Sequence, residues 1–94
     1  MHYVAAMAFS GSVDEQFAQA QAAVKGLTKD PGNDVKLQLY ALFKQASSGD
    51  VAGKRPGFTD PVGRAKYDAW GKVKGTSQDA AKEQYVGIVT GLVG

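Results

Sequence analysis

The stretch that decides the fold is SGDVAGKRPGFT, residues 48–59. It holds three glycines and one proline within twelve residues. Glycine and proline interrupt regular structure, and twelve residues is long for a connection between two antiparallel neighbouring helices. The stretch therefore predicts a crossover between helices that are not simple neighbours, and the periodic segments on either side of it supply the rest of the fold.

Two helices are predicted before the crossover. Ser12, with Glu15 three residues later, matches a capping box, so a first helix begins there and ends around Gly26. After the break TKDPGND, Asn33 or Asp34 can cap a second helix that runs to about residue 48. Their apolar stripes have helical spacing and comprise Val13, Phe17, Ala20, Val24 and Leu27, then Val35, Leu39, Leu42 and Ala46 with Phe43 at one edge.

Two more helices are predicted after the crossover. Asp60 followed by Pro61 is a cap with proline at the first helical position, and this third helix ends near residues 74–75. Thr76 or Ser77 caps a fourth helix. Its apolar stripe comprises Ala81, Tyr85, Ile88 and Leu92, with Val89 beside it. The sequence thus predicts an all-α protein of four helices, with residues 1–11 as an N-terminal arm and residues 12–94 as one domain.

Composition excludes several classes of protein. The chain of 94 residues has no cysteine, which excludes a disulfide framework, a thiolate nucleophile and zinc-finger chemistry. Its net charge is +2 and its lysines are dispersed, which argues against a nucleic-acid platform. No apolar run approaches the ~20 residues of a membrane span, and the N-terminus lacks the cationic region of a secretory signal. We expect a cytoplasmic protein with no stable membrane insertion.

Catalytic and metal-binding patterns are absent from the sequence. The single histidine, His2, lies in the arm, where no neighbouring element would fix its geometry. GDVAGKRP, residues 49–56, resembles a phosphate-binding Walker loop, but its two glycines are too close together and Arg55 stands where a magnesium-binding Ser or Thr is needed. The acidic residues in the first turns of the helices complement the helix dipole. We therefore expect neither a catalytic residue nor a metal site.

Lys66 occupies an unexpected place on the third helix. A helical wheel puts Val62, Ala69, Trp70 and Val73 within roughly a quarter turn of the helix surface, and Lys66 falls in the middle of that sector. A cation among apolar residues can extend its stem over them and keep its ammonium group in water. Alternatively, it can reach an anionic group on a bound molecule.

The second helix carries a related pattern. Lys36, Tyr40 and Lys44 are spaced four residues apart and form a line beside the core stripe, with Phe43 between that line and the core. These side chains can simply be a solvated helix face. Together with Lys66, they are also what a phosphate group attached to an organic body would require, because phosphate needs charge-assisted donors and the organic body needs aromatic surface.

A longer series of residues points to one family. The sequence YALFKQASSGDVAGKRPG, followed by GRAKYDAWGKVKGTS, strongly resembles the acyl-coenzyme A binding protein family. The shared pattern comprises Tyr40, Phe43, Lys44, Gln45, Ala46, Gly49, Asp50, Arg55, Pro56, Gly57, Ala65, Lys66, Tyr67, Asp68, Ala69, Trp70, Lys74, Gly75, Thr76 and Ser77. The resemblance runs without a gap from about Val13 to Leu92, so residues 12–94 are interpreted as an acyl-CoA-binding domain.

The resemblance implies a fold and a function. The family has an up-down-down-up four-helix bundle without catalytic activity or cofactor, and its members hold a fatty acyl-CoA with the 3'-phosphate and adenine at the surface and the acyl chain in a groove. By resemblance, the phosphate donors are Tyr40, Lys44 and Lys66, the adenine-facing aromatics are Phe43 and Tyr85, a flanking contact is Lys25, and the acyl groove is lined by Lys36 and Leu37.

Two positions depart from the family pattern, and one rival function stays open. Phe43 stands where many members have tyrosine, and Val62 where lysine is frequent, which predicts weaker head-group binding. The principal hypothesis is a monomeric intracellular carrier of medium-chain to long-chain acyl-CoA. The rival is a small helical protein–protein interaction module, for which the same apolar surfaces would form an interface. Acyl-CoA hydrolysis would need a nucleophile or base that the sequence does not offer.

Overall fold

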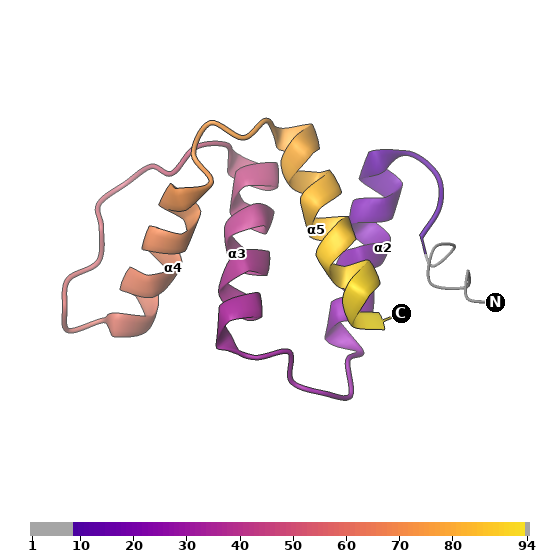
Figure 1. Cartoon of the computed structure of the whole chain (residues 1–94). Helices are drawn as coiled ribbons and strands as arrows, with labels where there is room; N and C mark the ends of the chain where they lie inside the picture. The colour runs from indigo at the N-terminus through magenta and orange to yellow at the C-terminus, as the bar shows by residue number, and fades with distance from the viewer. Residues whose placement is uncertain (1–8, 94) are drawn as a thin grey trace.

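A computed structural model describes residues 9–93 of the chain, which fold into four helices (Figure 1). The predicted arm, residues 1–11, lies mostly outside the described residues. None of the helices in residues 9–93 combines the length and the apolar character needed to cross a lipid bilayer. The helices are α2 (Val13–Lys25), α3 (Asn33–Ser48), α4 (Pro61–Lys72) and α5 (Gln78–Val93).

The helices form an open layer in the order α4, α3, α5, α2 (Figure 1). α3 packs against both α4 and α5, while α2 packs against α5. The dimensions of 47 × 28 × 16 Å reflect this flat arrangement. α3 and α4 run in the same direction and α2 and α5 run in the other, so the predicted up-down-down-up topology and the crossover between α3 and α4 are confirmed (Figure 1). The expectation that the crossover joins helices that are not simple neighbours is wrong, because α3 and α4 pack directly against each other.

Local sequence signals fix most of the helix starts. The capping box of α2 is present, with the Ser12 hydroxyl accepting the Glu15 N–H and the Glu15 carboxylate accepting the Ser12 N–H. Asp60 caps α4 by accepting the Gly63 N–H at 3.0 Å. The Ser77 hydroxyl accepts the Ala80 N–H at 3.0 Å, which selects Ser77 over Thr76 as the cap of α5.

The predicted cap of α3 is wrong. Gly32, and neither Asn33 nor Asp34, occupies the N-cap position, and glycine has no side chain that could accept an N–H of the first helical turn. The reason lies one turn earlier, because the Asp30 carboxylate accepts the Gly32 N–H at 2.8 Å and shapes the turn before the helix. Gly32 has a φ of 95°, a left-handed conformation that favours glycine, and its carbonyl accepts the first helical N–H from Lys36.

The hydrophobic core lies where α2, α3 and α5 meet. Its buried members are Phe17, Ala20, Leu39, Leu42, Ala46, Ala81, Tyr85 and Val89. On α5 the fully buried stripe passes through Val89, whereas Ile88 and Leu92 of the predicted stripe are half-buried. On α4, Val62 belongs to the apolar sector of the helical wheel, yet its side chain is 64% exposed.

A polar network locks the end of α3 to the α4–α5 loop. Gln45 is 1% exposed, and its amide donates to the Asp50 carboxylate at 2.8 Å and to the Thr76 carbonyl at 2.7 Å. The same Asp50 oxygen accepts the Gly75 N–H at 2.8 Å. Buried polar groups are costly unless they are hydrogen-bonded. These contacts therefore give a structural reason for much of the pattern KQA (residues 44–46), GD (49–50) and KGTS (74–77).

The crossover is also tied to α4. Arg55 donates two hydrogen bonds to the Asp68 carboxylate, at 2.8 and 2.7 Å, and the Tyr67 hydroxyl donates to the Gly53 carbonyl at 2.9 Å. A bidentate pair of this kind fixes orientation as well as distance. The long connection is therefore anchored along the outer side of α4, and the start of α4 is held in place.

Candidate functional site

The seam between α3 and α4 brings two lysines onto two aromatic rings. The Lys66 ammonium lies 5.4 Å from the centroid of the Tyr40 ring, and the Lys44 ammonium lies 4.9 Å from the centroid of the Trp70 ring. Tyr40 and Lys44 are one turn apart on α3, and Lys66 and Trp70 are one turn apart on α4. The two pairs therefore lie one turn apart along parallel helices. α3 contributes Tyr40 and Lys44, and α4 contributes Lys66 and Trp70, so each helix supplies one cation and one ring.

Both cations on this seam lack a neutralising carboxylate in the part of the chain that the structure describes. Within residues 9–93, neither Lys44 nor Lys66 takes part in an ion pair. A cation–π contact leaves the ammonium N–H groups available for an anion. Together with the Tyr40 hydroxyl, the seam presents several hydrogen-bond donors and a net positive charge, which is the chemistry that a phosphate group requires.

An aromatic row borders the seam on the side of α2. The Phe43 ring lies 6.2 Å from the Phe17 ring, and Phe17 meets Tyr85 edge-on at 5.1 Å. Phe43 is 37% exposed, so one part of its ring is available to a ligand. Tyr85 belongs to the buried core, and this burial raises the pKa of its hydroxyl. The structure therefore places Phe43 partly at the surface and Tyr85 in the core, with the Phe17 ring in contact with both.

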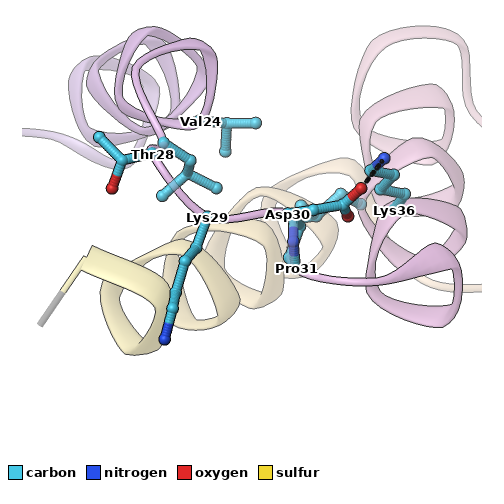
Figure 2. Close-up of a pocket in the computed structure, with 8 residues that line it drawn as sticks. Val24, Thr28, Lys29, Asp30, Pro31 and Lys36 are labelled. Carbon is cyan, nitrogen blue, oxygen red and sulfur yellow. Dashed lines mark hydrogen bonds and ion pairs between the residues drawn. The ribbon is translucent and has the colours of Figure 1, made fainter.

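Lys36 is engaged by a partner that the sequence analysis did not identify. Its ammonium lies 3.0 Å from the Asp30 carboxylate in the α2–α3 loop. The Gly32 N–H, and then Lys36, lower the pKa of Asp30. This pair borders a hollow between the end of α2 and the start of α3 (Figure 2). The hollow has a volume of about 350 Å³. No spacing rule connects Asp30 to Lys36, because the two belong to different elements.

Leu37 lies in a second hollow, on the side of α3 that faces α4 and α5. This cleft has a volume of about 680 Å³, with α3 as its floor. Apolar side chains from all three helices line it, among them Leu37, Ala65 and Ile88, and Asp34 and Asp68 are also part of its wall. Its volume falls within the range typical of small-molecule sites.

The sequence-predicted residues thus fall into three groups. Tyr40, Lys44 and Lys66 come together on the seam, with Phe43 next to Lys44 on α3. Lys36 and Leu37 line different hollows. Lys25 is exposed at the last turn of α2, where its charge complements the helix dipole. Trp70 also belongs to the seam, as the partner of Lys44, although the helical wheel placed it only in the apolar sector of α4.

Among residues 9–93, no cluster of acidic or histidine side chains could hold a metal ion.

The sequence and the fold of this chain are both similar to those of known proteins. The family model described as acyl-CoA binding protein matches residues 14–89. The acyl-CoA-binding protein homolog of Drosophila melanogaster is 54% identical over 81 residues, which cover 86% of this chain and 94% of that protein. The crystal structure of acyl-CoA-binding protein 2 from Oryza sativa superimposes with a TM-score of 0.83 at 36% identity, covering 87% of this chain and 91% of the other.

The chain belongs to the acyl-CoA binding protein family. Members of this family also occur as parts of larger proteins, since enoyl-CoA delta isomerase 2 of Homo sapiens is 44% identical over 78 residues. That match covers 83% of this chain and only 20% of the isomerase. What the two share is the acyl-CoA binding protein domain, and most of the isomerase has no counterpart here.

Proposed function

We propose that this protein binds medium-chain to long-chain fatty acyl-CoA esters and acts inside the cell as a carrier and buffer for them. It is a binding protein and not an enzyme. The observation that carries the proposal is the seam of α3 and α4, where Lys44 and Lys66 are held on aromatic rings and have no carboxylate partner among residues 9–93. Membership of the acyl-CoA binding protein family supports the same ligand.

The proposed arrangement of the ligand follows from the chemistry of each surface. The 3'-phosphate takes its donors from Lys44, Lys66 and the Tyr40 hydroxyl, because these are the charge-assisted and neutral donors on the seam. The adenine leans on the exposed part of Phe43, with Lys25 and Tyr85 as flanking positions. The acyl chain follows the apolar wall near Leu37.

Mass spectrometry under native conditions tests the proposal directly. We expect the purified protein to retain acyl-CoA as a one-to-one complex and to be monomeric. Titration calorimetry with palmitoyl-CoA and with free CoA gives the second readout, and the ester should bind much more tightly. Absence of binding to either ligand, together with discrete protein complexes in the spectrum, would instead support a protein–protein interaction module.

A further inference from the structure

The indole ring of Trp70 is held by burial and by one hydrogen bond. The side chain is 9% exposed, so most of its ring lies inside the protein. Its Nε1–H donates to the carbonyl of Gly49, the residue that ends α3, at 2.8 Å. This hydrogen bond spans 21 residues of sequence and ties α4 to the end of α3. The orientation of the ring is therefore fixed by the fold.

Lys44 lies over this fixed ring. Its ammonium is 4.9 Å from the centroid of the Trp70 ring, within the ~6 Å at which a ring face attracts a cation. Tryptophan attracts a cation more strongly than the other aromatic residues do. A free lysine side chain is long and flexible, and it loses conformational entropy when it binds an anion. The contact with the indole removes part of this freedom in advance.

Trp70 differs from Tyr40, the other ring of the seam, in what it can offer a ligand. Tyr40 is half-buried and carries a hydroxyl that can itself donate to a phosphate. The N–H is the only polar group of the Trp70 side chain, and the Gly49 carbonyl already accepts it. Trp70 thus has no further donor for a ligand, and its route to an anion on the seam passes through Lys44.

We propose that Trp70 is a positioning residue for the 3'-phosphate of acyl-CoA. The indole holds the Lys44 ammonium at the seam, and the ammonium N–H groups donate to the phosphate. The phosphate, the ammonium and the indole form one stack, in which the ring reduces the entropy that Lys44 loses on binding. This inference rests on the proposed function, because it concerns a residue that acts on the same site without touching the ligand.

A double-mutant cycle between Trp70 and Lys44 tests the proposal by calorimetry with palmitoyl-CoA. Trp70→Phe keeps a ring but loses the N–H and part of the attraction for a cation. We expect this variant to bind about threefold to tenfold more weakly than the parent. In a Lys44→Met background the same substitution should change the affinity less than about twofold, because the ammonium through which Trp70 acts is absent. Palmitoyl-dephospho-CoA, which lacks the 3'-phosphate, should show a similarly small loss.

Tyr67→Phe is the matched control. The Tyr67 hydroxyl donates to the Gly53 carbonyl at 2.9 Å, so this variant also removes a hydrogen bond between an aromatic side chain of α4 and the preceding connection. Within residues 9–93, no cation lies over the Tyr67 ring. We expect Tyr67→Phe to keep the parent's affinity, which separates a loosened connection from a lost Lys44 contact.

Tryptophan fluorescence gives a readout that needs no replacement of Trp70. The chain has one tryptophan, so the emission reports this ring alone. Lys44→Met removes the cation from the ring face and should shift the emission of the ligand-free protein. In the parent, saturation with palmitoyl-CoA should change the emission more than saturation with palmitoyl-dephospho-CoA does. This measurement decides the question also where Trp70→Phe fails to fold.

Three results would overturn the proposal. The first is an equal loss of affinity from Trp70→Phe in the parent and in the Lys44→Met background, since the tryptophan would then act through the fold alone. The second is a loss of the same size in Tyr67→Phe. The third is an emission spectrum that neither Lys44→Met nor the 3'-phosphate alters. Failure of the proposed function is a different result, because a parent protein that binds no acyl-CoA refutes the function, whatever the emission of Lys44→Met shows.

Discussion

Lys66 illustrates how little the fold gains from a side chain that the ligand needs. The residue is exposed, and its contact with the Tyr40 ring at 5.4 Å is of a kind that contributes about 0.5–1 kcal/mol at exposed sites. A charge-assisted hydrogen bond to a phosphate contributes about 1.5–3 kcal/mol. The contact of Lys66 with the ligand should therefore contribute more free energy than its contact with the Tyr40 ring.

Replacing Lys66 should separate these two terms. We expect Lys66→Ala to weaken acyl-CoA binding by roughly tenfold to a hundredfold and to lower the free energy of unfolding by no more than about 1 kcal/mol. Calorimetry and urea unfolding measure the two quantities. An acyl ester of dephospho-CoA, which lacks the 3'-phosphate, is the control and should lose much less affinity. Equal losses for both ligands would show that Lys66 does not contact the 3'-phosphate.

Phe43 is a position where a hydroxyl group can be added at the surface. Its ring is 37% exposed and packs at 6.2 Å from the ring of Phe17, so the phenol of Phe43→Tyr can reach solvent while the ring keeps its contact. We expect a modest gain in acyl-CoA affinity, about the 0.5–1.5 kcal/mol of one hydrogen bond. Phe43→Ala should weaken binding through the lost ring surface. A thermal midpoint of Phe43→Tyr far below that of the parent would show that the ring has no room for the hydroxyl.

At the scale of single residues, the sequence predicted neighbours within one helix better than it predicted contacts between different elements. The line of Tyr40 and Lys44 follows from spacing within one helix, and the structure keeps both on the seam. Burial of Gln45 does not follow from spacing, because its partner carbonyl at Thr76 is 31 residues away. Val62 was placed in an apolar sector, yet a helical wheel cannot show what covers a face. On the seam, Tyr40 pairs with Lys66 and Lys44 pairs with Trp70. By the same spacing, the position on α3 that corresponds to Val62 is Lys36.

At the scale of elements, the starts of helices were predictable wherever the cap is local. The capping box at Ser12 and the Asp60 and Ser77 caps each act within three residues, so the sequence alone identifies them. The start of α3 could not be found in this way, because Asp30 acts on the turn before the helix. The parallel direction of α3 and α4 was implied by the length of the crossover and by the family resemblance.

Carboxylates that fasten the loops to the helices should make the fold sensitive to acid. Asp30 and Asp50 each accept a backbone N–H, and Asp68 accepts both N–H groups of Arg55; these contacts lower the pKa of all three below the ordinary value of 3.8. A carboxylate with a lowered pKa stabilises the fold above its ordinary value, and the contribution disappears as the pH falls through the lowered value. The stability should therefore decrease at pH values below about 4.

Urea unfolding between pH 7 and pH 2 measures this dependence. Asp68→Asn should reduce the stability at neutral pH and flatten the acid dependence, because the charge that Arg55 stabilises is absent at every pH. Glu83→Gln is the matched control, since this exposed carboxylate lies beyond the first turn of α5 and makes no ion pair within residues 9–93. An unchanged acid slope for Asp68→Asn would show that the Arg55 contact forms equally well in the unfolded chain.

At the scale of the whole molecule, the open layer leaves room for a long apolar chain. The cleft between α4 and α5 has a volume of about 680 Å³ and an apolar floor on α3. Each buried methylene contributes about 0.8 kcal/mol, so four additional methylenes should tighten binding by up to roughly two orders of magnitude. A calorimetric series of acyl-CoA esters of increasing length measures the slope. Equal affinity for free CoA and palmitoyl-CoA would exclude an acyl groove.

The packing of α2 against α5 has a consequence for the order in which the protein folds. α2 finds its principal partner in α5, which begins more than fifty residues later in the chain. Until α5 emerges, Phe17 lacks its edge-on contact with Tyr85, and chaperones can reach the exposed part of its ring. Contacts between the two ends of a chain also carry a high loop-closure cost. This helical protein should consequently fold more slowly than bundles of similar size whose neighbouring helices pack in sequence order, and the packing of α2 becomes complete only after synthesis has passed α5.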